Sequence, residues 1–365
     1  MKKLTALVLA AAMTLSLAAC GSSPAPNPGS SPSASAPSAS APSASAPAPG
    51  ADGAPVLTTT DPISIVWSHN NPESSAAGQA ALKFKEEIEA RSNGVISVKV
   101  YANGELGTVP ENDQALREGT IQIVCGVSGG LVDPSLSYFD LPCLVSTSEA
   151  FETLFGRGTE LRAETERRYA DMGMQVLSLV AGGFSIISSN KEVRSYEDLA
   201  GLNIRTSENN IFMEEFRDWG CNPTPLAFGD LYVALQQGLV EAQNNTLDTT
   251  VSSLLYEQQK YIINTNHAVS PLGIYMNKAF YDGLPEDARA LIDWVCENVI
   301  DDYTRQLSAD AAEAALKTVR DAGLEVIDFT DEDRARMREN AQPVYDMVAG
   351  LVGQELIDRI SELQK

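Results

Sequence analysis

Residues 126–130 (GVSGG) have the G-x-S-x-G spacing of a nucleophile elbow, in which a serine attacks an ester carbonyl. His267 lies downstream as a candidate base, and Asp230 or Asp248 would supply the acid of a triad. An elbow needs a helix directly after its serine, whereas here an Asp-Pro pair follows within about one turn. A glycine-rich loop that ends a strand and lines a ligand cleft, with Ser128 as a cleft hydroxyl, explains the same residues. A secreted esterase-like hydrolase is therefore kept only as a minor alternative.

Motifs for metals and cofactors are missing from the sequence. Histidine occurs only at His69 and His267, and there is no H-E-x-x-H, Walker or dinucleotide-binding fingerprint. After Cys20, the remaining cysteines form no C-x-x-C pair, which argues against a zinc site: Cys125, Cys143, Cys221 and Cys296. One disulfide and buried free thiols both stay open for them. We expect no metal, no cofactor and no catalytic residue.

The N-terminal residues predict export. Lys2 and Lys3 precede an apolar, alanine-rich run that ends at Ala19 and is too short to span a membrane, so residues 1–19 are predicted to be a signal peptide. The run ends in LAACG, which resembles the bacterial lipobox, so we expect Cys20 to carry lipid. An ordinary secretory signal with a chance cysteine is the alternative. Residues 20–60 are almost wholly Ser, Pro, Ala and Gly, a composition typical of a disordered tether.

The remaining chain, from about residue 61 to residue 365, is long enough for two lobes with sizeable cores. Its composition is ordinary for a globular protein, with 44% apolar and 21% charged residues over the whole sequence. The formal net charge of −23 argues against nucleic acid or an anionic lipid surface as a partner. It leaves the ligand open, because a local pocket can be positive on an acidic molecule.

Hydrophobic periodicity predicts strands alternating with helices. In the first part of the body we expect strands over 63–67, 96–101 and 120–125, and helices over 77–88 and 111–118. The pattern βαβαβ favours a largely parallel sheet covered by helices. Ser146 has the spacing of a capping box with Glu149, and we expect one helix from there to about residue 173.

A second alternation begins around Gly182-Gly183. The expected strands are 174–180, 184–189, 203–206, 239–243 and 325–329, and the expected helices are 208–219 and 230–237. From Pro285 to Gly323 no glycine or proline interrupts a helical pattern that would reach roughly 55 Å, which is longer than one lobe is wide. Such a helix would have to cross between lobes. Thr330 and Asp333 have the spacing of a cap for the last helices.

One long stretch, from Val193 to His267, carries a resemblance to a known family. It contains D-L-x-G-x-x-x-R, ending at Arg205, and P-x-x-F-x-D-x-Y-x-A-L-Q-x-G, beginning at Pro225. Gln243-x-Asn245 and further matches up to His267 follow in order. This pattern resembles the P subunit of TRAP transporters, the dicarboxylate and sialic-acid type of solute-binding protein. The resemblance covers about residues 63–295, with Asp230 where the family usually has Glu.

The resemblance implies a binding site for an organic acid. It assigns Arg205 to the ligand's carboxylate, Asn245 to the same carboxylate or a neighbouring hydroxyl, and Phe228 to the ligand's carbon face. A planar guanidinium offers parallel donors that match a carboxylate. The alternatives are a salt-bridge arginine, a turn-forming asparagine and a core phenylalanine.

Three further residues are candidates for ligand contact from strand ends and loops: His69, Asn70 and Ser128. Many family members have a second arginine where this chain has Ser185. A small hydroxyl there leaves one fewer positive charge facing the ligand, which weakens an assignment to dicarboxylates. We therefore expect a monocarboxylate.

The family likeness also implies the architecture and the partners. We expect an α/β, two-lobe fold like the type II periplasmic binding proteins, with a long interlobe helix. One lobe would comprise 61–182 plus 271–310, and the other 183–270 plus 311–365. The expected partners are a small organic acid and the TRAP membrane permease, with a lipid anchor holding the exported protein at the cell membrane and no nucleic acid bound. A ligand-sensing lipoprotein that reports to a receptor is the other alternative, and an ABC-type binding protein fits the Arg205 to His267 stretch poorly.

Overall fold

The computed structural model describes residues 52–127 and 129–363. The predicted signal peptide, Cys20 and nearly all of the predicted tether therefore lie outside the described residues, as does Ser128. Within the described ranges, no helix is both long and apolar enough to cross a membrane.

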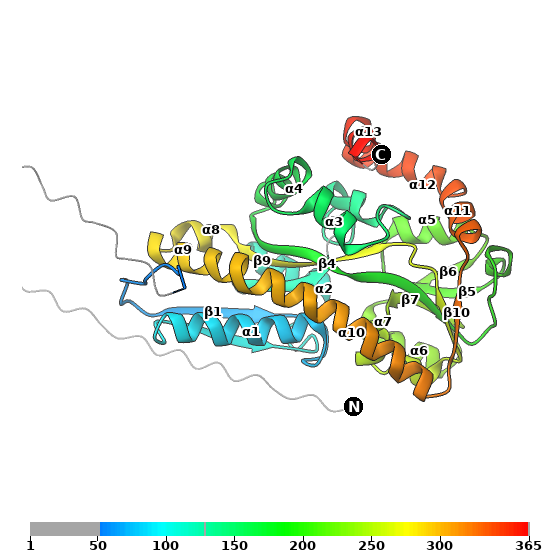
Figure 1. The fold of residues 1–365 in the computed structure, drawn as a ribbon, viewed down its shortest axis with the longest axis horizontal. Helices are drawn as coiled ribbons and strands as arrows, with labels where there is room; N and C mark the ends of the chain where they lie inside the picture. Colours follow the sequence, from blue (N-terminus) through cyan, green and yellow to red (C-terminus); the bar gives the residue numbers. More distant parts are fainter. Residues whose placement is uncertain (1–51, 128, 364–365) are drawn as a thin grey trace, which may run out of the picture. The chain divides into compact units, whose positions relative to one another are not determined.

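The first half of the fold alternates strands and helices, as its periodicity predicts (Figure 1). Its elements are β1 (Ile63–Ser68), α1 (Ala76–Arg91), β2 (Ile96–Tyr101), α2 (Val109–Glu118), β3 (Ile123–Val127), the 3-10 helix η1 (Pro134–Asp140), α3 (Ser148–Phe155), α4 (Glu160–Asp171) and β4 (Met174–Ser189). The single helix expected up to residue 173 was wrong. Thr147, rather than Ser146, caps α3, and the chain leaves the helix at Gly156 before Thr159 caps α4.

The second half continues the alternation with shorter elements. They are η2 (Tyr196–Leu199), β5 (Asn203–Thr206), α5 (Asn210–Asp218), β6 (Asn222–Pro225), η3 (Phe228–Asp230), α6 (Leu231–Gln236), β7 (Ala242–Thr246), α7 (Leu247–Ser252), η4 (Leu255–Gln258), β8 (Tyr261–Asn264), β9 (Val269–Asn277) and α8 (Lys278–Gly283). The strand expected at 239–243 begins three residues later, and β6, β8 and β9 were not predicted.

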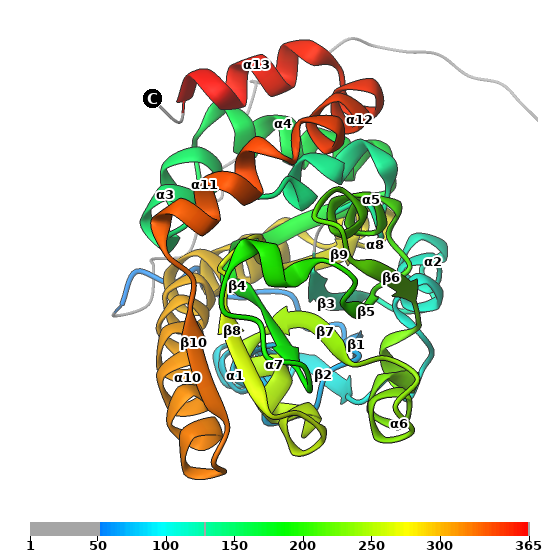
Figure 2. The ribbon, with the colours of Figure 1, turned by 90° about the vertical axis from the view of Figure 1, so that its right-hand side faces the viewer.

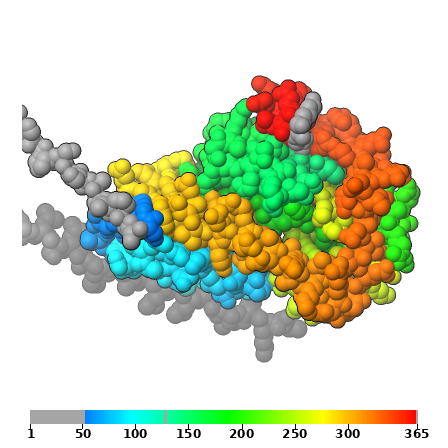
Figure 3. Space-filling view, viewed as in Figure 1, coloured from blue at the N-terminus to red at the C-terminus, as the bar shows by residue number. Residues whose placement is uncertain are grey.

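A continuous helical stretch follows and confirms the predicted long helix. It consists of α9 (Glu286–Val295), one π-helical turn η5 (Cys296–Ile300) and α10 (Asp301–Asp321). It packs against α1 near one end and α7 near the other, and so reaches both halves of the sheet. In the space-filling view this orange helix lies across the surface between the cyan α1 region and the green α3 and α4 region (Figure 3).

The chain ends with β10 (Glu325–Asp328), α11 (Asp331–Glu339), α12 (Gln342–Val352) and α13 (Gln354–Leu363). Thr330 and Asp333 form the predicted capping box of α11. Figure 2 shows these last helices passing back over α3 and α4. Apolar side chains of α12 and α13 accordingly share a core with η1, α3 and α4.

The sheet as a whole is mixed, while the parallel arrangement expected from the first βαβαβ segment is confirmed for β1, β2 and β3. Its main path runs β2-β1-β3-β9-β4-β7-β5-β6, with β8 paired to β4 and β10 to β8. The outer pairs β1–β2, β1–β3, β5–β6 and β5–β7 are parallel. The central pairs β3–β9, β4–β9 and β4–β7 are antiparallel. The parallel outer strands agree with the local alternation, and the long antiparallel strands join the two halves.

Strand β4 is the physical link between the halves. The sequence predicts two strands here, separated at Gly182-Gly183, but one strand of 16 residues runs through. Its first part pairs with β9, and from Ser185 onward it pairs with β7 and β8. The register shifts between Ala181 and Phe184, at the glycine pair. A Cβ at Gly182 would lie 2.7 Å from Cβ of Leu272, so the close approach of β9 requires glycine there.

Candidate ligand-binding site

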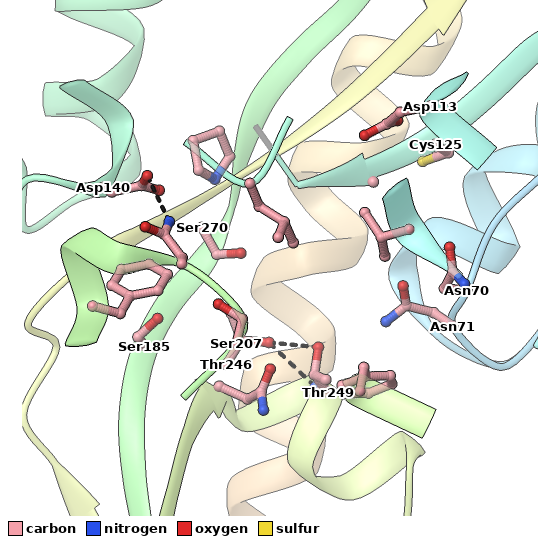
Figure 4. A pocket seen from close by; sticks show the side chains of 18 of the residues that line it. Asn70, Asn71, Asp113, Cys125, Asp140, Ser185, Ser207, Thr246, Thr249 and Ser270 are labelled. Atoms are coloured by element: carbon pink, nitrogen blue, oxygen red, sulfur yellow. Dashed lines mark hydrogen bonds between the residues drawn. The ribbon is translucent and has the colours of Figure 1, made fainter. Parts of the chain in front are cut away.

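A cavity of about 170 Å³ lies where strand ends from both halves of the sheet meet. Its walls come from the end of β1, from α2 and β3 on one side, and from β4, β5, β7 and α7 on the other. Figure 4 shows polar side chains from these elements facing the same space. The polar lining residues are Ser68, Asn70, Asn71, Asn112, Asp113, Asp140, Ser185, Arg205, Ser207, Asn209, Asn244, Asn245, Thr246, Thr249 and Ser270.

Arg205 extends from β5 into this cavity and is 3% exposed. Its Nε and Nη2 both donate to the carbonyl oxygen of Leu226, at 3.0 and 2.6 Å. Among the described residues, no carboxylate oxygen lies within 4 Å of the guanidinium. Burial lowers the pKa of Arg205 to about 10, which still leaves the group cationic at neutral pH. The chain thus buries a positive charge and supplies only one carbonyl oxygen to it.

The other residues predicted from this half of the sheet also line the cavity. Ser185 lies on β4 opposite Thr246 of β7, and Asn245 precedes that threonine. Asn245 donates its side-chain amide to Oε1 of Gln243, which leaves its own carbonyl oxygen for a donor. Phe228 opens η3, directly after the segment that carries the Leu226 carbonyl, and is partly buried.

Of the site residues predicted in the N-terminal half of the fold, only some line the cavity. Asn70 lines the cavity, and its Nδ2 donates to the Gly107 carbonyl at 2.8 Å. His69 does not line it, and is 1% exposed. Ser68 and Asn70 face the cavity on either side of His69, and side chains alternate between faces in extended chain. The imidazole therefore lies outside this cavity lining, and a ligand contact from His69 stays a prediction.

The hydrolase arrangement is not assembled. Ser128 lies outside the described residues, although Gly126 lines the cavity. No helix begins there, because the next helical element is η1 at Pro134. His267 does not line the cavity and is fully buried, edge-on to Phe216 and Trp219. Burial lowers the pKa of His267 to about 3.

Two acidic residues in the cavity wall were missed by the sequence analysis. Asp113 lies on α2, and Asp140 ends η1. Burial raises the pKa of each carboxyl group to about 7. Asp140 Oδ2 accepts hydrogen bonds from the backbone N–H of Gly130 at 2.6 Å and from Nδ2 of Asn209 at 2.8 Å. Only Asp140 could have been found from the sequence, because it is an acid inside an apolar run. Acidic side chains are rarely buried in such runs unless they have a hydrogen-bonding or pairing partner.

The four cysteines after Cys20 are all free thiols. Three of them are buried, and Cys143 is partly buried. The sequence left open whether two of these cysteines form a disulfide, and in the structure none of the four does. Cys125 is the one that lines the cavity, and burial raises the pKa of its thiol to about 12, so it stays protonated at neutral pH. Among the described residues, no cluster of His, Cys, Asp and Glu could hold a metal ion.

Residues 67–350 match the family described as bacterial extracellular solute-binding protein, family 7. The chain is 31% identical to the C4-dicarboxylate-binding periplasmic protein DctP of Rhodobacter capsulatus, over 83% of this chain and 91% of that protein. It is 30% identical to the 2,3-diketo-L-gulonate-binding periplasmic protein YiaO of Escherichia coli K12, over 82% of this chain and 92% of that protein.

The fold is similar to solved structures as well. The sugar acid binding protein DctPAm of Advenella mimigardefordensis, solved in complex with galactonate, superposes with a TM-score of 0.79 at 25% identity. The match covers 84% of this chain and 99% of that one. It confirms the predicted α/β architecture of two lobes with a long helix.

Proposed function

This chain belongs to the bacterial extracellular solute-binding proteins of family 7, and from that membership we propose that it captures an organic acid by pairing the acid's carboxylate with Arg205. It is a solute-binding protein of the TRAP type, not an enzyme. The observation that carries the proposal is the buried guanidinium of Arg205, which faces the cavity with one carbonyl oxygen as its partner. The charge of Glu208 offsets part of the burial but no described carboxylate is bonded to the guanidinium, so a ligand carboxylate would supply the paired counter-charge.

The ligand class follows from the charges in the cavity. Arg205 is the only basic side chain among the described lining residues, and Ser185 stands where many relatives have a second arginine. One guanidinium neutralises one carboxylate, so we propose a monocarboxylate. Asn245 and Ser185 would hydrogen-bond the same end of the ligand, while Phe228 covers its carbon face. The relatives named above bind a dicarboxylate, a diketo sugar acid and galactonate, which are all organic acids.

Capture would couple to lobe closure about the crossing strands. We propose that the lobes divide at Gly182-Gly183 of β4 and again at the start of β9, near residue 271. Because α12 and α13 share a core with η1, α3 and α4, while α12 also packs against α5, we propose that residues 342–363 lie across the boundary between the lobes and not wholly within the second. Closure excludes water from the cavity and strengthens the pairing of guanidinium and carboxylate. The closed surface would then be presented to the TRAP permease.

We also propose that the exported protein is anchored by lipid on Cys20, through the LAAC sequence that precedes the tether. Metabolic labelling with a fatty acid should mark the wild-type chain and leave Cys20→Ser unlabelled. If the wild-type protein is released without lipid, the anchor is refuted and the binding function is unaffected.

The binding proposal is tested by finding the ligand and removing its partner. Mass spectrometry of small molecules released from the purified protein identifies candidate acids, and calorimetry measures their affinity. Arg205→Ala should weaken binding about a hundredfold, on the order of 3 kcal/mol, because the carboxylate would lose a desolvated, charge-assisted partner. Arg217→Ala, at an exposed arginine of α5, is the matched control. Equal affinity in Arg205→Ala and the wild type would refute the site.

A further inference from the structure

The two sides of the cavity carry opposite charges. Arg205 lies on β5 in the wall formed by the second half of the sheet, and Asp113 lies on α2 in the wall formed by the first half. Figure 4 shows Asp113 on the side that also carries Asn70 and Asn71, across the cavity from Ser185. A ligand long enough to reach both walls therefore meets a cation at one end and a carboxyl group at the other.

Asp113 differs from the other acid of the cavity in having no hydrogen-bond partner for its buried oxygen. Oδ2 of Asp113 is buried and accepts no hydrogen bond from any described residue. Asp140, by contrast, receives two N–H donors from the protein. A buried carboxyl oxygen without a donor costs free energy, on the order of 1–3 kcal/mol. Such a group calls for an explanation, and a donor supplied by a ligand in the cavity is one that fits its place in the wall.

The donors around Asp113 are already used elsewhere. Asn112 Nδ2 donates to Oδ1 of Asn70 and to the Gly107 carbonyl, at 3.0 and 3.1 Å. Asn70 Nδ2 donates to the same Gly107 carbonyl. Arg117, one helical turn along α2, is exposed and donates to the carbonyl of Val132 at 2.9 Å. Asn70, Asn112 and Arg117 thus direct these donors to other acceptors, although the charge of Arg117 still lowers the pKa of Asp113 in part.

From this arrangement we infer that Asp113 selects the far end of the ligand: a monocarboxylic acid whose other end carries a hydrogen-bond donor, either a protonated nitrogen or a hydroxyl group, and not a second carboxylate. The inference rests on the proposed function, because Arg205 must hold the ligand's carboxylate for Asp113 to meet the opposite end. A second carboxylate would bring like charge against an ionised Asp113 and offers no donor to Oδ2. A donor-bearing end satisfies that oxygen and, where it is cationic, pairs with its charge.

The pH dependence of binding distinguishes the two kinds of ligand. Burial raises the pKa of Asp113 to about 7, and the charge of Arg117 on the same helix offsets part of that rise. Arg205 and Asp140 are the other basic or carboxylic side chains among the described lining residues of the cavity. A cationic ligand end favours ionised Asp113, so binding releases a proton and affinity rises with pH up to about 7. A dicarboxylate would need protonated Asp113 as a donor, so its affinity would fall over the same range.

The test uses acids that differ only at the far end: succinate, γ-hydroxybutyrate and γ-aminobutyrate, together with their longer and hydroxylated homologues. Calorimetry on the full exported chain should rank the hydroxyl- and amine-bearing acids above the dicarboxylate of the same length. Asp113→Asn should weaken the preferred acids roughly tenfold or more and narrow their advantage over the dicarboxylates. Glu118→Gln, an exposed acid on the same helix, is the matched control and should change nothing.

The outcomes separate this inference from the proposed function. Loss of binding in Arg205→Ala with no change in Asp113→Asn overturns the role of Asp113 and leaves the carboxylate site standing. Dicarboxylates ranking first in the wild type also overturn it. Binding of none of these acids, nor of any copurifying acid that bears a far-end donor, overturns the role of Asp113, and the carboxylate site is then judged by the copurifying ligand and Arg205→Ala. Preference for the amine-bearing acids, with proton release on binding, supports a cationic nitrogen; preference for the hydroxyl-bearing acids, without proton release, supports hydroxyl donors.

Discussion

Arg205 and Arg157 each donate from their guanidinium to a backbone carbonyl oxygen, but their other partners differ. Arg157 follows α3, and its Nε donates to Oδ2 of Asp301 at 2.5 Å while Nη2 donates to the Leu177 carbonyl at 2.6 Å. The other oxygen of Asp301 accepts from the hydroxyl of Ser178. Arg205 has only the carbonyl of Leu226.

The pKa of each guanidinium group depends on these partners. Burial by itself lowers the pKa of Arg157, but the Asp301 carboxylate more than offsets this, and its pKa is raised. Around Arg205 burial dominates, and the pKa falls to about 10. The Arg157–Asp301 pair joins the segment after α3 to α10 and to β4, whereas Arg205 has no directly bonded carboxylate among the described residues. The contrast agrees with the proposal that Arg205 pairs with an anion from outside the chain.

The largest effect is expected when ligand is present and Arg205 is removed. A ligand at a hundred times its dissociation constant stabilises the wild-type fold by about 2.7 kcal/mol. Arg205→Met should abolish most of this gain, while the ligand-free variant stays within about 1 kcal/mol of the wild type, since loss of the bond to Leu226 offsets relief of the buried charge. Denaturant unfolding with and without the copurifying acid measures both quantities. A variant destabilised without ligand as strongly as with it would make Arg205 a structural arginine.

At Arg157, loss of the carboxylate partner is expected to lower the free energy of unfolding even without ligand. Asp301→Ala removes the counter-charge of Arg157 and the acceptor of Ser178, and should lower the free energy of unfolding by about 2 kcal/mol. The value lies below that of a fully buried pair because the side chain of Arg157 is 34% exposed. Asp302→Ala is the control, since its side chain is 80% exposed. Unchanged stability in Asp301→Ala would remove the distinction between the two arginines.

Glu215 is a carboxyl group that is buried without a cation beside it, as Arg205 is a guanidinium buried without a carboxylate. It lies on α5, neither oxygen has a hydrogen-bond partner among the described residues, and burial, with Asp140 nearby, raises its pKa well above the usual range. The folded state therefore binds a proton that the unfolded state releases above about pH 4.3, so stability falls as pH rises from there. Glu215→Gln should flatten this fall by about 1 kcal/mol per pH unit. Thermal unfolding of both proteins from about pH 5 to about pH 7 measures it, and parallel curves would contradict the prediction.

The sequence predicted those features that short-range patterns encode. Periodicity gave the first strands and helices, and the absence of glycine and proline gave the long helix through residue 321. The family pattern brought Arg205 to the cavity wall because the residue is fixed at the end of a short strand. These elements depend on their own residues and little on what packs against them.

The features that were missed depend on contacts far apart in the chain. Strand β4 continues through Gly182-Gly183 because β9 pairs along it, and a glycine pair alone predicts a break. His69 lies outside the cavity lining, while Ser68 and Asn70 on either side of it line the cavity. Neighbouring side chains of an extended chain point to opposite faces, so a shift of one residue decides which of them reaches the cavity. Asp113 gave no signal, since an acid on a polar helix is ordinary until the helix is seen to line a cavity.

The smallest expected change in the free energy of unfolding is at Asp287, a carboxylate that accepts hydrogen bonds from neutral donors and not from a cation. Asp287, in the first turn of α9, accepts the backbone N–H and the hydroxyl of both Thr58 and Thr59, at 2.6 to 2.8 Å. Burial alone would raise its pKa, but these four donors lower it well below the usual range. Asp287→Ala should therefore lower the free energy of unfolding by about 1 kcal/mol, because partly exposed hydrogen bonds are worth little each. Glu286→Ala, an exposed neighbour, serves as the control.

The stability that Asp287 contributes also depends on pH. Because its pKa is lowered in the folded state, the contribution is fully present above the unfolded pKa of about 4 and is lost as pH falls further, so the stabilities of Asp287→Ala and the wild type should converge in acid. A difference that persists undiminished at low pH would show that Asp287 acts through packing and not through its charge.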